Sequence, residues 1–206
     1  LNCMWLLCSL PIVTMGAATT AAYTITLKMV NDEEGYIAGP FWKEFKANLK
    51  KGSILGVIAL VACYAVYLDF QLYHVAKQHN MMFLIVGVIG IYLIFMHIVF
   101  AFPLLARYEN SIVNTMRNSY SIAAKFLGRT AFLAVLLVIE MAIILWNLTT
   151  MFAGLLIGPA CIILTISGFA NSFFTVIERE NLMAEQEEKE STHLNGEPIS
   201  GDEDDI

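Results

Sequence analysis

Residues 81–105 read MMFLIVGVIGIYLIFMHIVFAFPLL, a run without Asp, Glu, Lys or Arg. A helix needs about 20 apolar residues to cross the hydrocarbon core of a bilayer, and this run is long enough. Water is absent there, so the backbone must satisfy its own N–H and C=O groups, which a helix does. The run therefore predicts a transmembrane helix.

Similar apolar blocks fill most of the chain of 206 residues, of which 58% are hydrophobic. Soluble domains are nearer 45–50% apolar, so the excess must face something other than water. We predict an all-α membrane protein, a six-helix transmembrane bundle in which the first helix is truncated at its start. The predicted segments are residues 1–13, 16–30, 53–72, 81–105, 130–150 and 154–177.

Two stretches between these segments are amphipathic. In the first, Phe41, Trp42 and Phe45 share one helical face, and lysines occupy the rest. In the second, apolar residues recur at helical spacing from Ile112 to Leu127. Both patterns predict helices that lie in the membrane interface with the apolar side facing the lipid.

Lysine and arginine indicate the orientation, because cytoplasmic loops carry an excess of both. The side of the membrane that holds both amphipathic stretches carries nine of them, and the opposite side carries only Lys77. We therefore predict that both amphipathic helices and both termini are cytoplasmic. The nine are Lys28, Lys43, Lys46, Lys50, Lys51, Arg107, Arg117, Lys125 and Arg129.

The end of the chain differs in composition from the rest. From Glu178 onward it holds 11 of the 18 acidic residues and two of the 12 basic ones. Apolar residues are almost absent after residue 184, so this part lacks the means to bury a core. We predict a transmembrane domain over residues 1–180 and an acidic, disordered cytoplasmic tail over 181–206, with the last helix extending toward residue 190.

Glu140 is the sharpest single feature of the apolar segments. It lies eleven residues after Arg129, about 16 Å above the cytoplasmic edge at 1.5 Å per residue. An ionised carboxylate is costly at that depth. The same counting predicts a polar layer near mid-membrane made of Glu140, His97, Ser167 and Thr19. Two interpretations of Glu140 stay open: a protonated clamp between helices, or a group that moves a proton or solute. His97 is open in the same way, as a packing residue or as a functional one.

A docking surface for a partner is a further prediction. Its candidate residues are Phe41, Trp42, Phe45, Arg107, Tyr108, Glu109 and Asn110. For Arg107 the alternative is that the side chain reaches from a helix end to the membrane surface.

The sequence shows no enzyme motif: no glycine-rich phosphate loop, nucleophile elbow or paired-histidine metal spacing. We therefore predict a protein that is not an enzyme and has no metal and no cofactor. Nucleic-acid binding is not expected, because the basic residues follow the membrane topology. The sequence does not indicate an oligomeric state.

Three stretches carry a family resemblance. They are LLCSLPIVTMGAATTA (6–21), FWKEFKANLK (41–50) and FPLLARYENSI (102–112). Together they resemble the YesL-like integral membrane proteins of bacteria. The resemblance implies a plasma-membrane location and, by association of such proteins with sugar importers, a role in carbohydrate uptake. It supplies no catalytic residues.

These observations lead to a function hypothesis with alternatives. The chain is expected to be an accessory component of a bacterial carbohydrate ABC import system that contacts the permease subunits in the lipid bilayer. The alternative is a stand-alone permease for a small solute, or one coupled to protons, that uses the polar layer around Glu140. A third interpretation is a membrane sensor or scaffold that uses its acidic tail.

Overall fold

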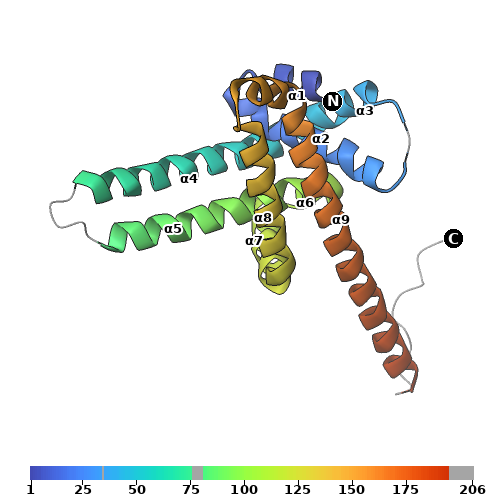
Figure 1. The fold of residues 1–206 in the computed structure, drawn as a ribbon. Coiled ribbons are helices and arrows are strands. Elements are labelled where there is room, and N and C mark those ends of the chain that lie inside the picture. Colours follow the sequence, from blue (N-terminus) through green and yellow to red (C-terminus); the bar gives the residue numbers. More distant parts are fainter. Residues whose placement is uncertain (34, 76–80, 195–206) are drawn as a thin grey trace. The chain divides into compact units, whose positions relative to one another are not determined.

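The computed structural model describes residues 1–33, 35–75 and 81–194, and within them it contains helices and no strand. Figure 1 shows their arrangement. The short helices are α1 (Asn2–Ser9), η1 (Ile12–Thr14), α2 (Met15–Val30), α3 (Ala38–Ala47), η2 (His97–Ala101), α6 (Phe102–Arg107) and α7 (Ile112–Lys125). The long ones are α4 (Leu49–Val75), α5 (Met81–Met96), α8 (Leu127–Ile144) and α9 (Leu148–Leu194).

Four helical stretches are long and apolar enough to cross a membrane, which indicates a multi-pass membrane protein. They are Leu49–Val75, Met81–Arg107, Leu127–Ile144 and Leu148–Ser191. The predicted bundle of six crossing helices is not established, because α1 and α2 have only 8 and 16 residues. Between them the chain leaves helical geometry at Pro11, which cannot donate a backbone hydrogen bond and lies extended, with φ −75° and ψ 111°.

Within the described residues, α2 is the most buried helix of the chain. Every residue from Gly16 to Leu27 except Thr19 is buried, and α1, α3, α4 and α6 pack against it. Its residues are mainly alanine and threonine. The hydroxyls of Thr20, Thr24 and Thr26 each donate to the carbonyl four residues earlier, at 2.9, 3.3 and 3.1 Å. The polar atoms of this buried helix are thus satisfied internally.

Helices α2 and α4 approach each other backbone to backbone near their first residues. A Cβ added at Gly16 would collide with the carbonyl oxygen of Gly52 and lie 2.9 Å from the Cα of Gly56. A Cβ at Gly52 would lie 2.7 Å from the Cα of Ala17. Gly52 and Gly56 are four residues apart, a spacing that lets two membrane helices meet backbone to backbone. The small residues Gly16 and Ala17 make this contact from the side of α2.

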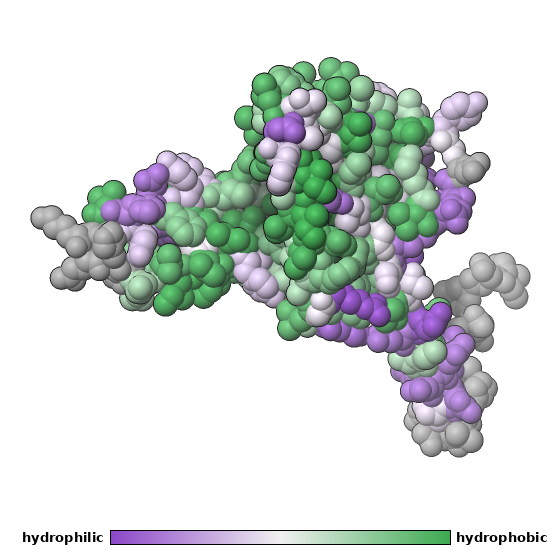
Figure 2. All heavy atoms as spheres, viewed as in Figure 1, coloured by the Kyte–Doolittle hydropathy of each residue, from purple (hydrophilic) through white to green (hydrophobic). Residues whose placement is uncertain are grey.

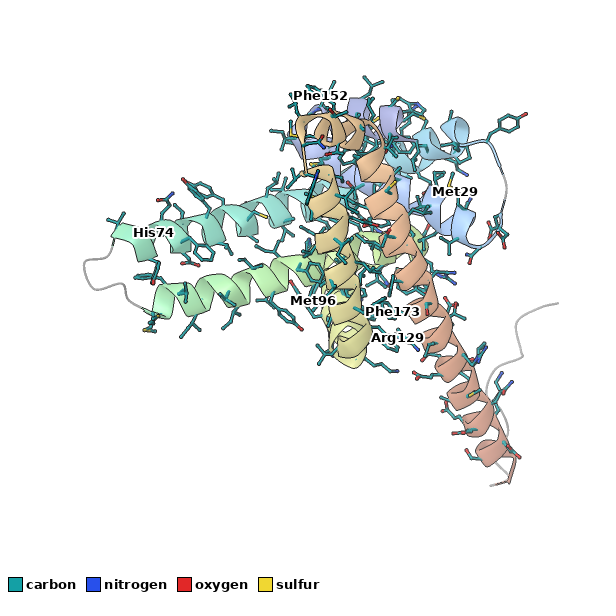
Figure 3. All side chains as sticks on the ribbon, viewed as in Figure 1. Met29, His74, Met96, Arg129, Phe152 and Phe173 are labelled. Carbon is teal, nitrogen blue, oxygen red and sulfur yellow. The ribbon has the colours of Figure 1, made fainter. Side chains whose placement is uncertain are left out.

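The α4–α5 hairpin is packed differently. The two helices lie side by side (Figure 1), and larger side chains of α4 pack against small residues of α5. Gly87 faces the Phe70 ring, and Gly90 faces Val66. Most other side chains of the hairpin are exposed, and Figure 2 shows hydrophobic residues over this part of the chain. His74 and Met96, labelled in Figure 3, mark the far end of α4 and the end of α5.

The segment predicted at 81–105 is one helical stretch with a local change of geometry. Residues His97–Ala101 form a wide π turn between α5 and α6. Pro103, near the start of α6, has no N–H to give to the carbonyl four residues earlier, which accounts for irregular pairing at this point. The π turn is buried except at Ile98.

The helix predicted at 130–150 ends earlier, at Ile144. Asn147 begins the next helix instead: its Oδ1 accepts from the Thr150 N–H at 2.9 Å, and its own N–H donates to Thr150 Oγ1 at 3.0 Å. This reciprocal cap explains why the apolar run is interrupted by a turn.

The chain divides into two compact units, Leu1–Ala170 and Asn171–Ile206. In the second unit, α9 continues as a helix through Leu194, and the side chains from Arg179 to Ser191 are exposed. The last helix was predicted to extend toward residue 190, and it is helical through Leu194. The tail was predicted to be disordered from residue 181. Residues 181–194 are helical instead, and residues 195–206 lie outside the described residues.

Candidate functional site in the membrane-spanning helices

Glu140 lies on α8 and contacts α9. Its Oε1 accepts a hydrogen bond from Thr165 Oγ1 at 2.5 Å. Its Oε2 is buried and has no hydrogen-bond partner among the described residues. A short hydrogen bond between two membrane helices fits the interpretation of Glu140 as a clamp. The unpaired oxygen fits the interpretation in which Glu140 moves a proton or solute.

A hollow of about 290 Å³ borders Glu140. Apart from Glu140, Thr150 and Cys161 its lining is aliphatic, with Ile143 and Ile144 from α8 and Ile157 and Ile162 from α9. Ile144 packs onto two glycines of α9, since a Cβ at Gly154 would lie 2.6 Å from Ile144 Cγ2. Because the lining is mostly apolar, few polar groups in this hollow are available to bond the carboxylate of Glu140.

His97 lies at the start of the π turn and is 3% exposed. Its Nε2 donates to the backbone carbonyl of Leu55 on α4 at 3.2 Å, and its Nδ1 is buried without a partner among the described residues. The Phe102 ring meets the imidazole edge-on, with 6.0 Å between ring centroids. The imidazole thus fixes the π turn to α4 near the Gly52–Gly56 contact.

The other two members of the predicted layer also have partners of their own. Ser167 Oγ and Thr26 Oγ1 are 2.6 Å apart and buried, and they join α9 to α2. Thr19 accepts from the indole Nε1 of Trp5 on α1 at 3.1 Å and donates to the Met15 carbonyl at 2.8 Å.

The four predicted polar residues therefore form four separate contacts, and none of the hydrogen bonds described joins one of them to another. Sequence reasoning missed the partners. Phe132 and Phe169 also pair between α8 and α9, with 6.0 Å between ring centroids.

The predicted docking residues fall into two groups. Phe41 and Phe45 are buried, at 0% and 8% exposure, on the side of α3 that packs against α2, whereas Trp42 is 47% exposed. Arg107, Tyr108 and Asn110 are half-buried, with the Arg107 guanidinium 5.9 Å from the Tyr108 ring centroid, and Glu109 is exposed. The two buried phenylalanines serve the core of this chain, so a partner would have to use the others.

The second amphipathic stretch is helical, as α7, over Ile112–Lys125. Ser111 caps it by accepting from the Asn114 N–H at 3.3 Å, and Thr115, Ser119, Ile122 and Ala123 are buried. Partial burial raises the pKa of the Tyr120 phenol. Among the described residues no group of three His, Cys, Asp or Glu side chains could hold a metal ion.

The fold defines an α-helical, multi-pass membrane protein with a glycine- and alanine-packed centre. Residues 1–70 match a family model described as "Protein of unknown function, DUF624". This match covers α1 to α3 and most of α4, which include the two N-terminal stretches of the YesL-like resemblance. No curated protein and no solved structure matches the chain.

Proposed function

We propose that this protein is a non-enzymatic accessory component of a bacterial carbohydrate ABC import system, embedded in the plasma membrane. The observation that favours it is the separate pairing of the polar groups in the membrane-spanning helices. Thr19, His97 and Ser167 each have a partner inside the chain, and among the described residues no hydrogen bond links these groups into a path along which a solute would move. The role in carbohydrate uptake comes from the YesL-like resemblance.

The proposal includes an orientation. Lysines and arginines accumulate around α3 and α7, and this supports a cytoplasmic position for both helices and both termini. We include α1 and α2 as two further, short crossings that complete a six-helix bundle. At 1.5 Å per residue α2 is about 24 Å long, so the bilayer would have to thin slightly around it.

A permease subunit has two exposed surfaces to contact. One is the α4–α5 hairpin, on which large apolar side chains such as Val61, Leu68 and Ile89 are between 42% and 63% exposed. The other is the bend at Tyr108, Glu109 and Asn110, which follows α6.

Co-purification tests the proposal. The tagged protein is crosslinked in its native membrane, solubilised in mild detergent and analysed by mass spectrometry, with recovery of carbohydrate-importer permease subunits as the expected result. Glu109→Arg should reduce this recovery, whereas Glu185→Arg, which makes the same charge change on exposed α9, should not. Recovery of this chain without any permease subunit would contradict the proposal.

The second candidate is a permease for a small solute, coupled to protons through Glu140. It is favoured by the unpaired, buried Oε2 and by the hollow of about 290 Å³ beside it. Proteoliposomes with an imposed proton gradient test it: solute-driven proton uptake that Glu140→Gln abolishes, while the purified variant stays monodisperse, would favour transport. Absence of flux from wild-type protein would leave Glu140 as a clamp.

A further inference from the structure

A second apolar hollow, of about 490 Å³, lies between α1 and α3. We call it the α3 hollow. Its lining includes Met4, Leu7, Cys8, Trp42, Phe45 and Leu49. The lining is almost wholly apolar, and it brings residues of the first and third helices to the start of α4. An apolar hollow on a membrane protein is filled in the bilayer, because leaving it empty forfeits contact with its walls.

Four exposed lysines accompany the α3 hollow. Lys43 and Lys46 lie on α3, and Lys50 and Lys51 lie in the first turn of α4. The Lys46 ammonium lies 5.1 Å from the ring centroid of Trp42, which lines the hollow. Lys46 thus places a positive charge beside the hollow, and the other three lysines lie on the same two helices, α3 and α4, that contribute to its lining.

The acidic side chain nearest in sequence is Glu44, which is half-buried and paired with its own helix. Its carboxylate Oε2 accepts from Asn48 Nδ2 at 3.4 Å, and its backbone carbonyl accepts from the same group at 3.1 Å. Over residues 41–52 the chain carries four lysines and one glutamate, a formal charge of +3. The occupant of this place should therefore be anionic at one end and apolar along the rest.

We propose that the α3 hollow binds an anionic phospholipid, with one acyl chain along the apolar lining and the phosphate head group against Lys46, Lys50 and Lys51. Charge complementarity selects this occupant over a zwitterionic lipid, since each lysine near an anionic membrane surface adds attraction. Trp42 suits the boundary position, because tryptophan places an apolar ring beside the head groups. The inference depends on the membrane location of the chain and not on the importer role.

The test uses the full chain in nanodiscs that contain phosphatidylglycerol and phosphatidylcholine, with native mass spectrometry of the lipids retained after release. Wild-type protein should retain phosphatidylglycerol selectively. Replacing Lys46, Lys50 and Lys51 by Gln should lower that selectivity by about fivefold for each lysine removed. Replacing Arg117, Lys125 and Arg129 by Gln removes the same charge around α7 and should leave the selectivity near the wild-type value.

A second pair of variants tests the acyl chain. Leu7 lines the hollow and is 67% exposed, so Leu7→Gln should fold and should reduce retention of phosphatidylglycerol. Leu10 is 75% exposed and is not part of the lining, so Leu10→Gln is the matched control.

Four results would overturn the proposal. The first is equal retention of the two lipids by wild-type protein. The second is equal selectivity of the two lysine and arginine triple variants. The third is displacement of phosphatidylglycerol by inorganic phosphate together with no effect of Leu7→Gln, which would make the lysines a site for free phosphate. A protein recovered in place of lipid, and lost only in the Lys46, Lys50 and Lys51 variant, would also contradict it.

Discussion

Helix α2 and the α4–α5 hairpin are both strongly apolar, yet α2 is buried among other helices and most of the hairpin is exposed. In α2 every residue from Gly16 to Leu27 except Thr19 is buried, whereas among the described residues of α4 and α5 only Gly52, Leu55, Gly87 and Met96 are. The difference is residue size: α2 is built of glycine, alanine and threonine, and the hairpin of valine, leucine and isoleucine. In a membrane apolar character alone does not drive helices together, so the small residues indicate where backbones meet.

The largest effect is expected at the glycine contact between α2 and α4. Gly52→Ala places a methyl group 2.7 Å from the Cα of Ala17, and backbone on both sides prevents an easy adjustment. We expect a loss of about 3 kcal/mol in the free energy of unfolding, measured by thermal denaturation in detergent. Gly39→Ala is the control, because nothing lies within 4 Å of its added Cβ. Equal stability of the two variants would show that the two helices do not meet here.

A smaller effect is expected inside the hairpin. At Gly90 an added methyl group would meet Val66 Cγ2 at 2.5 Å, and that group belongs to a side chain that can change rotamer. Gly90→Ala should therefore cost about 1 kcal/mol by the same measurement. The double variant with Val66→Ala should recover most of the loss. A double variant that is less stable than Gly90→Ala would contradict the pairing of these two residues.

The buried hydroxyl pair should contribute less again. Thr26→Val keeps the shape of the side chain and removes its bond to Ser167, 2.6 Å away. A double-mutant cycle with Ser167→Ala should give a coupling free energy of about 0.6 kcal/mol, the usual value for hydrogen bonds between membrane helices. Additive single effects, with zero coupling, would indicate that the two hydroxyls are not bonded in the bilayer.

The smallest effect is expected on the exposed face of the hairpin. Val61 is 63% exposed, so Val61→Leu should change the free energy of unfolding by less than about 0.5 kcal/mol. A loss comparable to that of Gly90→Ala would mean that a protein surface, such as a second copy or a permease subunit, covers this face in the purified sample.

The sequence indicates which segments are helical in this chain, because periodicity and length alone predict α4, α5, α8 and α9 and the amphipathic α3 and α7. It was less informative where proline and helix caps interrupt apolar runs. Pro11 separates α1 from α2, and the Asn147 cap ends the run that was predicted to continue to residue 150. Both signals are local and could have been used.

Counting residues along a helix predicts that Glu140 and His97 lie near mid-membrane, and this depth stays a prediction. The contacts of these residues were not predicted. Contacts such as Glu140 with Thr165, or Thr19 with Trp5, depend on how helices rotate and pair, and one sequence does not specify that. For the same reason, Phe41 and Phe45 were predicted at a docking surface although their helical face packs against α2.

Lipid photolabelling tests the contrast between the two regions most directly. Native vesicles are loaded with a fatty acid that carries a diazirine in its chain, irradiated, and the adducts are assigned to peptides by mass spectrometry. The account predicts adducts on the exposed side chains of residues 57–75 and 81–95 and almost none on residues 16–27. Equal labelling of the two regions, or no labelling of the hairpin, would contradict it.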